Sequence, residues 1–161
     1  MNTTAKDLRD IVESTVERLQ AIPESRSQMS RGDGQWPAKQ ILGHLIDSAS
    51  NNHQRFVRAQ FTDDLVFPGY DQEQWIRAQR YDAEPWLALV ELWRSYNLHL
   101  AHVIENIPEI TLTRLRPAHT LDKIAWQRVQ AGEATTLKYL VRDYVGHLQD
   151  HLQQLFGAAP V

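Results

Sequence analysis

Residues 139–156 read YLVRDYVGHLQDHLQQLF, and their apolar positions recur at the spacing of a long amphipathic helix. Residues three and four apart are neighbours on a helix surface. One stripe of this helix therefore carries Leu137, Leu140, Tyr144, His147, His151 and Leu155. His147 and His151 stand one turn apart on this apolar face. Their spacing allows one helix to offer two nitrogen ligands to a single metal ion.

A histidine pair at this spacing also arises by chance, because short motifs have a high false-positive rate. The alternative to a metal site is two hydrogen-bonded or partly exposed imidazoles. Two buried histidines must find partners or remain neutral. The pair alone leaves both readings open, and a metal site needs a third ligand from elsewhere in the chain.

Composition sets the outer bounds of the protein class. The 161 residues fit a single domain over residues 1–161, long enough to bury a sizeable core. A hydrophobic content of 42% and a charged content of 23% argue against long disordered segments. The net charge of −3 gives no basic footprint for nucleic acid. Cysteine is absent, which excludes disulfides, thiolate metal ligands and a cysteine nucleophile.

The sequence also bears on location. Its first residues, MNTTAKD, lack the apolar region of a signal peptide. No stretch approaches the roughly 18 apolar residues of a membrane span. We therefore expect a cytoplasmic protein with no membrane and no nucleic-acid partner.

Three further stretches share the helical period. The predicted helices span about residues 3–22, 37–60, 82–107 and 136–156. Their expected N-caps are Thr3 or Thr4, Asp82, and Thr135 or Thr136, while Pro37 opens the second helix. Four long amphipathic helices predict an all-α fold, an antiparallel four-helix bundle.

The connections are less regular than the helices. A long, partly helical connection joins helices 2 and 3, with Asp71 expected to cap a short helix. Residues 110–113 alternate between apolar and polar side chains like a brief extended segment. Phe67, Tyr70 and Trp75 in the long connection are the apolar side chains that could form a contact surface between subunits.

The second helix carries a line of polar side chains beside its apolar face. His44 begins this line, which continues through Asp47, Ser48, Asn51 and Arg55. Taken singly, these residues also fit an ordinary boundary between core and solvent. Metal sites in helical bundles are built from facing helices, so His44 is the candidate third ligand for His147 and His151. Three neutral imidazoles suit a divalent ion, zinc or nickel foremost, with iron as an alternative.

The remaining histidines of the long helices receive a different interpretation. His99 and His102 lie off the apolar stripe of the third helix, and we expect them at the surface. A fourth ligand such as His53 or His102 would close the coordination shell and indicate a structural site. An enzyme needs an open position and a pocket instead.

Two stretches carry a family resemblance. Residues 36–48 read WPAKQILGHLIDS and residues 144–151 read YVGHLQDH, and together they resemble the DinB-like superfamily of metal-dependent enzymes. The resemblance covers nearly the whole chain. It implies a four-helix bundle whose metal is held by His44, His147 and His151. One departure is Pro37, where members commonly carry a serine or threonine that caps the helix.

The resemblance also implies an activity class. Some relatives are S-transferases or isomerases that use a low-molecular-weight thiol such as bacillithiol or mycothiol, and others are described as hydrolases. A small-molecule substrate and a homodimer follow from the same resemblance. The His-x-x-x-His motif contains no glutamate, so the general base of zinc proteases is missing. The alternative to an enzyme is a non-catalytic bundle, with or without a bound ion.

Five residues are candidates for supporting the metal ligands or lining a pocket. They are Asp47, Ser48, Asn51, Asp143 and Tyr144. Metal-bound histidines usually donate their second N–H to a carboxylate, a carbonyl or water, and Asp143 lies one turn before His147. The alternative for Asp143 is a solvent-facing charge. Asp150 is closer in sequence to His151 but points about a hundred degrees away around the helix.

Overall fold

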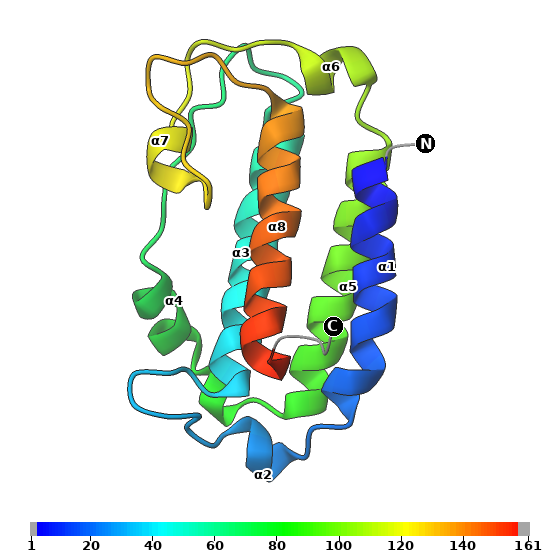
Figure 1. The fold of residues 1–161 in the computed structure, drawn as a ribbon, viewed down its shortest axis with the longest axis vertical. Coiled ribbons are helices and arrows are strands. Elements are labelled where there is room, and N and C mark those ends of the chain that lie inside the picture. The colour runs from blue at the N-terminus through cyan, green and yellow to red at the C-terminus, as the bar shows by residue number, and fades with distance from the viewer. Residues whose placement is uncertain (1–2, 158–161) are drawn as a thin grey trace.

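Four long helices form the body of the protein in the computed structural model, which describes residues 3–157 (Figure 1). They are α1 (Thr3–Gln20), α3 (Ala38–Arg58), α5 (Trp86–Glu105) and α8 (Leu137–Phe156). Residues 3–157 contain no β-strand, only two isolated bridges. Within the same range, no helix combines the length and the apolar character that crossing a membrane requires. The all-α bundle predicted from the sequence is confirmed.

Short helices occupy the connections. They are α2 (Glu24–Ser27), α4 (Gln72–Gln79), the 3-10 helix η1 (Tyr81–Ala83), α6 (Glu109–Thr113) and α7 (Leu121–Ile124). The long connection between α3 and α5 is partly helical, as expected, because it holds α4 and η1. Residues 110–113 were expected to be extended but lie within α6, since Pro108 in the position before the helix favours a helical first turn.

The N-caps follow the sequence in two places and depart from it in two. The Asp71 carboxylate accepts hydrogen bonds from the N–H groups at the start of α4, and Thr136 caps α8. Asp82 does not cap the third long helix. It lies in η1, and Pro85 takes the cap position of α5 because its fixed φ suits the entry to a helix. Thr3 and Thr4 lie inside α1 rather than at its cap.

The order of the helices around the bundle differs from a simple antiparallel arrangement. α1 packs beside α5 and α8, and α3 also packs beside α5 and α8. The colours of Figure 1 show α3 and α5 running in the same direction. Accordingly, Lys39 at the start of α3 donates to the carbonyl of Glu84 just before α5. The prediction of a fully antiparallel bundle is wrong for this pair.

The reason is the path of residues 59–85. A 21-residue helix such as α3 is about 31 Å long. An extended chain covers up to about 3.3 Å per residue, so this connection is long enough to return along the whole bundle before α5 begins. Figure 1 shows it descending beside α3 through α4. One flank of α3 is thereby covered by loop rather than by a fourth long helix.

Two helix glycines let aromatic rings approach the bundle closely. A Cβ atom on Gly43 would lie 2.2 Å from Cδ2 of Tyr81, and one on Gly146 would lie 3.0 Å from Cζ3 of Trp126. Contacts that short do not occur without movement of the ring or the helix. Each glycine directly precedes a histidine, so the backbone of the candidate site is held by packed rings at both helices.

Candidate metal centre

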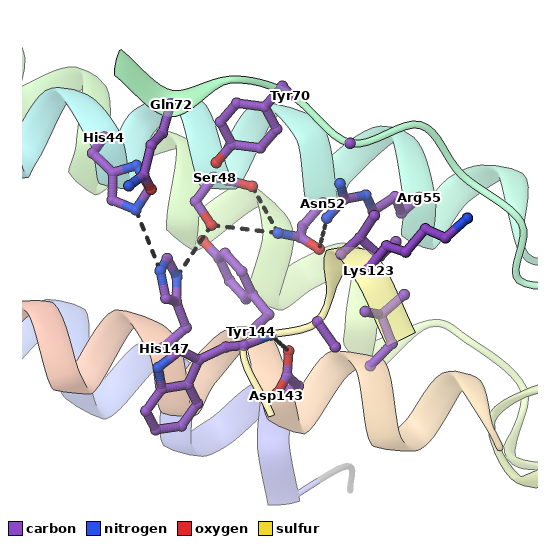
Figure 2. A pocket seen from close by; sticks show the side chains of 15 residues that line it. His44, Ser48, Asn52, Arg55, Tyr70, Gln72, Lys123, Asp143, Tyr144 and His147 are labelled. Carbon is purple, nitrogen blue, oxygen red and sulfur yellow. Dashed lines mark hydrogen bonds between the residues drawn. The ribbon is translucent and has the colours of Figure 1, made fainter. Parts of the chain in front are cut away.

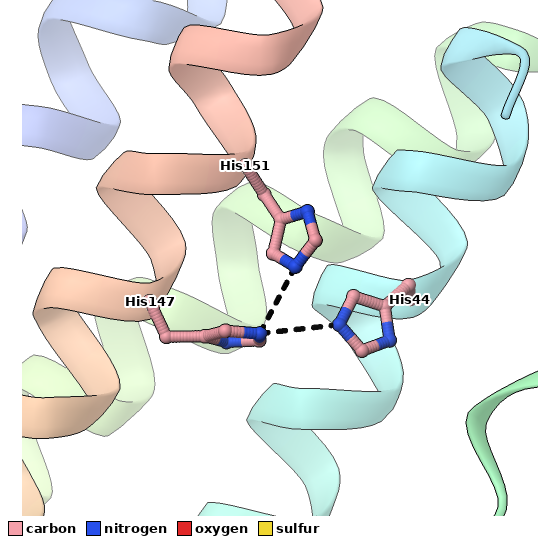
Figure 3. Close-up of side chains that lie close together, drawn as sticks. All are labelled: His44, His147 and His151. Atoms are coloured by element: carbon pink, nitrogen blue, oxygen red, sulfur yellow. Dashed lines mark hydrogen bonds between the residues drawn. The ribbon is translucent and has the colours of Figure 1, made fainter. Parts of the chain in front are cut away.

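His44, His147 and His151 converge across the gap between α3 and α8 (Figure 3). His147 Nε2 lies 3.3 Å from His44 Nε2 and 3.0 Å from His151 Nε2. One ligand nitrogen from each of the three rings lies within 4.8 Å of the other two. His44 is buried at 2% exposure, and the other two are half-buried. The structure thus brings together the three ligands predicted from the sequence.

The spacing of these nitrogens fits a metal ion. Nitrogen ligands at 2.0–2.1 Å from a tetrahedral zinc ion are about 3.3 Å apart. Nitrogen–nitrogen hydrogen bonds explain the cluster poorly, because a neutral imidazole has a single N–H donor and His147 Nε2 faces two other nitrogens. The donor set, three imidazoles with no thiolate, suits a borderline divalent ion. The residues present therefore fit such an ion.

Burial keeps the rings in the form that binds metals. It lowers the pKa of His44 to about 3, with the neighbouring imidazoles His151 and His147 contributing in the same direction. Burial lowers the pKa of His147 to about 4, and it also lowers the pKa of His151. All three rings are neutral near pH 7, so a lone pair is available on each without loss of a proton.

The second nitrogen of each ring has a different environment. His151 Nδ1 lies 3.2 Å from Gln154 Oε1, an acceptor that places the proton on Nδ1 and leaves Nε2 free. His147 Nδ1 lies 3.5 Å from the Ser48 hydroxyl oxygen. His44 Nδ1 is buried and has no hydrogen-bond partner among residues 3–157.

A cavity of about 220 Å³ adjoins the triad on one side (Figure 2). Its walls come from α3, α8, the segment before α4, and residues 123–126 at the end of α7. His44 and His147 border it at one end, and Arg55 and Lys123 lie at the other. A second cavity of about 480 Å³ reaches His151 beside Trp36. Open space therefore meets the triad from two sides.

Three of the five predicted pocket residues line the first cavity. Ser48, Asp143 and Tyr144 do so. The Tyr144 hydroxyl donates to Asn97 Oδ1 on α5. Asn51 lies outside this cavity and donates to the carbonyl of Asp47.

The two predicted carboxylate partners are engaged elsewhere. Asp47 Oδ1 accepts hydrogen bonds from the Tyr81 hydroxyl at 2.6 Å and from Gln79 at 2.7 Å, whereas its buried Oδ2 has no hydrogen-bond partner among residues 3–157. Asp143 makes no hydrogen bond to His147. Its carboxylate instead accepts the backbone N–H groups of Trp126 at 2.8 Å and Gln127 at 2.7 Å. The backbone N–H groups of Trp126 and Gln127, from the connection before α8, thus take the place of His147 as partners of Asp143. The spacing of residues along α8 cannot reveal these donors.

Other cavity residues escaped the sequence interpretation. Asn52, Tyr70, Lys123 and Trp126 line the cavity, and none was a candidate. Asn52 was not part of the polar line of α3, but it lies one turn after Ser48, so the helical spacing gave a usable signal. The other three belong to connections whose path the sequence pattern does not determine.

The remaining histidines of the long helices stay away from the triad. His53 is half-buried on α3, and His99 and His102 are exposed on α5, the surface position expected for these two. His53 Nδ1 lies 3.3 Å from the Tyr96 hydroxyl, and its ring contacts the ring of His99. Among residues 3–157, no fourth histidine or carboxylate joins the cluster of His44, His147 and His151.

Comparisons with known proteins agree with this architecture. A search of curated protein sequences finds no match. The structure is similar to that of YfiT from Bacillus subtilis, described as a probable metal-dependent hydrolase with an unusual four-helix bundle topology. The TM-score is 0.71 at 17% sequence identity, covering 99% of this chain and 91% of YfiT. A family model described as the DinB superfamily matches residues 7–155, and the chain therefore belongs to this superfamily.

Proposed function

We propose that this protein is a metal-dependent enzyme that binds a divalent ion, zinc or nickel, through His44, His147 and His151. The observation that carries the proposal is the convergence of three imidazole nitrogens beside a cavity, with no fourth ligand from residues 3–157. Three-histidine sites that keep positions open are typical of catalysis, whereas structural sites are closed by a fourth ligand. Bound there, the ion would act as a Lewis acid that lowers the pKa of a coordinated thiol or water.

The reaction we favour is the transfer of a low-molecular-weight thiol to a small-molecule electrophile. The chain has no cysteine, so the thiol must be a cosubstrate. Two cavities reach the triad, which provides separate approaches for two substrates. Once formed, a thiolate attacks without further help from a general base.

The arrangement of carboxylates supports the same choice. Water attack commonly uses a positioned carboxylate or histidine as general base. In this protein Asp47 is held by Tyr81 and Gln79, and both oxygens of Asp143 accept backbone N–H groups. Neither carboxylate is hydrogen-bonded to a triad histidine, although the buried Asp47 Oδ2 has no hydrogen-bond partner among residues 3–157.

Hydrolysis is the second candidate. It is favoured by the similarity to YfiT, which is itself described as a probable metal-dependent hydrolase. In this reaction the coordinated group would be water, and the Ser48 hydroxyl, 3.5 Å from His147 Nδ1, is the polar group on α3 that contacts the triad. A non-catalytic bundle remains the alternative from another class.

The test compares three readouts on protein reconstituted with zinc, nickel or cobalt. The cobalt form reports thiolate coordination by a charge-transfer band on addition of a thiol. The zinc and nickel forms are assayed for S-conjugation of a chlorodinitrobenzene and for hydrolysis of nitrophenyl esters. Each assay is repeated with His147→Ala and with the matched control His53→Ala.

Thiol transfer predicts a thiolate band and metal-dependent S-conjugation that His147→Ala abolishes and His53→Ala retains. Metal-dependent ester hydrolysis without a thiolate band would reject thiol transfer and indicate that the protein is a hydrolase. If the ion binds but accepts no thiol and supports neither reaction, the result would indicate a non-catalytic metal-binding bundle.

A further inference from the structure

Arg55 on α3 is a buried cation that forms no ion pair with residues 3–157 and interacts with Asp143 only through charge at longer range. Its exposure is 6%. The guanidinium donates to Asn52 Oδ1 at 3.4 Å and to the carbonyl of Pro68 at 3.1 Å. No carboxylate among residues 3–157 lies within the 4.0 Å of an ion pair with it. A guanidinium has five N–H donors, and a buried charge normally has a partner of opposite sign.

Arg116 shows how this chain buries an arginine for structural reasons. It is 1% exposed and donates to three backbone carbonyls, those of Ala59, Asp64 and Thr111. These bonds join three segments of the chain, and Arg116 does not line the cavity beside the triad. Arg55 bonds to a single backbone carbonyl and borders that cavity, so bracing the fold does not account for its position.

The cavity is lined by a second cation, Lys123, and by one carboxylate, that of Asp143. The exposed side chain of Lys123 lines it opposite α3, and its ammonium group makes no hydrogen bond or ion pair with residues 3–157. Asp143 is the acidic residue of the lining, and backbone N–H groups engage both of its oxygens. Two cations and one carboxylate therefore line the same space, and the balance of positive charge favours an anionic ligand.

We propose that Arg55 and Lys123 bind a carboxylate group of the substrate, whose reacting end reaches the histidine triad. This inference rests on the proposed function, because it assigns the other end of the cavity to the reacting group. A planar carboxylate accepts two parallel N–H bonds from a guanidinium, and the lysine adds a point charge. The substrate class is a small organic acid.

The geometry of α3 sets the length of that acid. His44 and Arg55 are separated by roughly 16 Å along the helix axis. Side chains on a helix lean toward its N-terminus, and the bond from Arg55 to Asn52 shows that the guanidinium does so. The ligand thus spans roughly 10–12 Å between its metal-binding atom and its carboxylate. A cavity of about 220 Å³ admits a slender chain of this length.

The experiment uses two thiols of equal length as probes for cobalt-loaded protein. 8-Mercaptooctanoate ends in a carboxylate, and 8-mercaptooctanamide ends in a neutral amide. In both, the sulfur serves only to anchor the probe, and the thiolate–cobalt band gives the dissociation constant. We expect the carboxylate probe to bind the wild-type protein about tenfold more tightly, the value of a charge-assisted hydrogen-bond pair.

Substitutions of arginines on α3 test which side chain causes the preference for the carboxylate probe. Arg55→Met should abolish it, and Arg55→Lys should restore part of it, with folding of each variant verified by circular dichroism. Arg58→Met is the matched control, because Arg58 is an exposed arginine one turn further along α3 that does not line this cavity. Equal affinity for the two probes in the wild type, or a preference that survives Arg55→Met, would overturn the inference.

A second measurement separates this inference from the proposed function. If no thiol gives a band, the thiol-binding metal site is wrong, but the anion site remains testable in metal-free protein. There, the Arg55 Nε–H resonance is followed by nuclear magnetic resonance during addition of octanoate or octanamide. A saturable shift with octanoate alone supports the carboxylate site, and equal or absent shifts with both reject it.

Discussion

Two groups of histidines lie along α3, and ring proximity does not distinguish them. The rings of His53 and His99 have centroids 5.1 Å apart, while those of His44 and His147 are 5.2 Å apart. The difference lies in where the nitrogens point. In the triad they converge within 4.8 Å, whereas His53 Nδ1 faces the Tyr96 hydroxyl.

Burial separates the two groups as well. The triad lies between α3 and α8, with His44 almost wholly enclosed, and cavities open beside it. The group on α3 and α5 ends in the exposed side chains of His99 and His102. Spacing on one helix is therefore a weak indicator of a metal site. Convergence of nitrogens from a second helix at a largely buried position is the stronger indicator.

The largest expected difference between the groups is metal retention. Protein purified without a histidine tag should carry about one divalent ion per chain, since three imidazoles form the site. His44→Ala, His147→Ala and His151→Ala should each reduce the content to background, measured by mass spectrometry of the metals. His53→Ala and His99→Ala should leave it unchanged. Metal that survives all three triad substitutions would show that the ion binds elsewhere.

The next difference concerns the metal-free protein at acidic pH. Unfolded histidine protonates near pH 6.5, whereas burial lowers the pKa of His44 to about 3 and that of His147 to about 4. Between pH 6.5 and about 4 the unfolded state binds more protons, so the free energy of unfolding decreases as the pH falls. Each such imidazole lowers the free energy of unfolding by up to about 1.4 kcal/mol for each pH unit of acidification.

Urea denaturation at pH 7, 6 and 5 measures this slope. His147→Asn should flatten it, because one buried imidazole is removed. His102→Asn, which removes an exposed ring of the other group, should leave it as in the wild type. A wild-type stability that is constant from pH 7 to pH 5 would contradict the buried, neutral state of the triad.

A smaller effect is expected from the glycines that precede two triad histidines. Gly43→Ala places a Cβ atom 2.2 Å from the Tyr81 ring, and overpacking of this kind costs about 1–3 kcal/mol. The better helix propensity of alanine recovers about 1 kcal/mol. We therefore expect a lower melting temperature. Gly132→Ala is the control, because a Cβ atom there meets nothing within 4 Å. Equal melting temperatures for the two variants would show that Tyr81 moves aside freely.

The sequence predicted those parts of the molecule that depend on helical period. The four long helices and the pairing of His147 with His151 follow from residues three and four apart, the Thr136 cap was one of two threonines expected from residue type, and His44 was assigned to the pair on α8 through the expected bundle and the family resemblance. The parallel course of α3 and α5 was not predicted, because it depends on the path of residues 59–85, which have no regular period. The same limit hid Lys123 and Trp126, which reach the cavity from a connection.

The partners of the second ring nitrogens offer the finest comparison. His151 Nδ1 faces Gln154 Oε1 at 3.2 Å, and His53 Nδ1 faces the Tyr96 hydroxyl at 3.3 Å, so the two contacts are nearly equal in length. Outer-shell contacts of metal ligands are worth about 10–100-fold in metal affinity. Because Gln154 is exposed and water can replace its amide, we expect Gln154→Ala to weaken zinc binding by about tenfold at most. Tyr96→Phe should leave the affinity unchanged in the same chelator competition. A loss of equal size in both variants would mean that the two histidine groups are coupled through α3, and the distinction between them would fail.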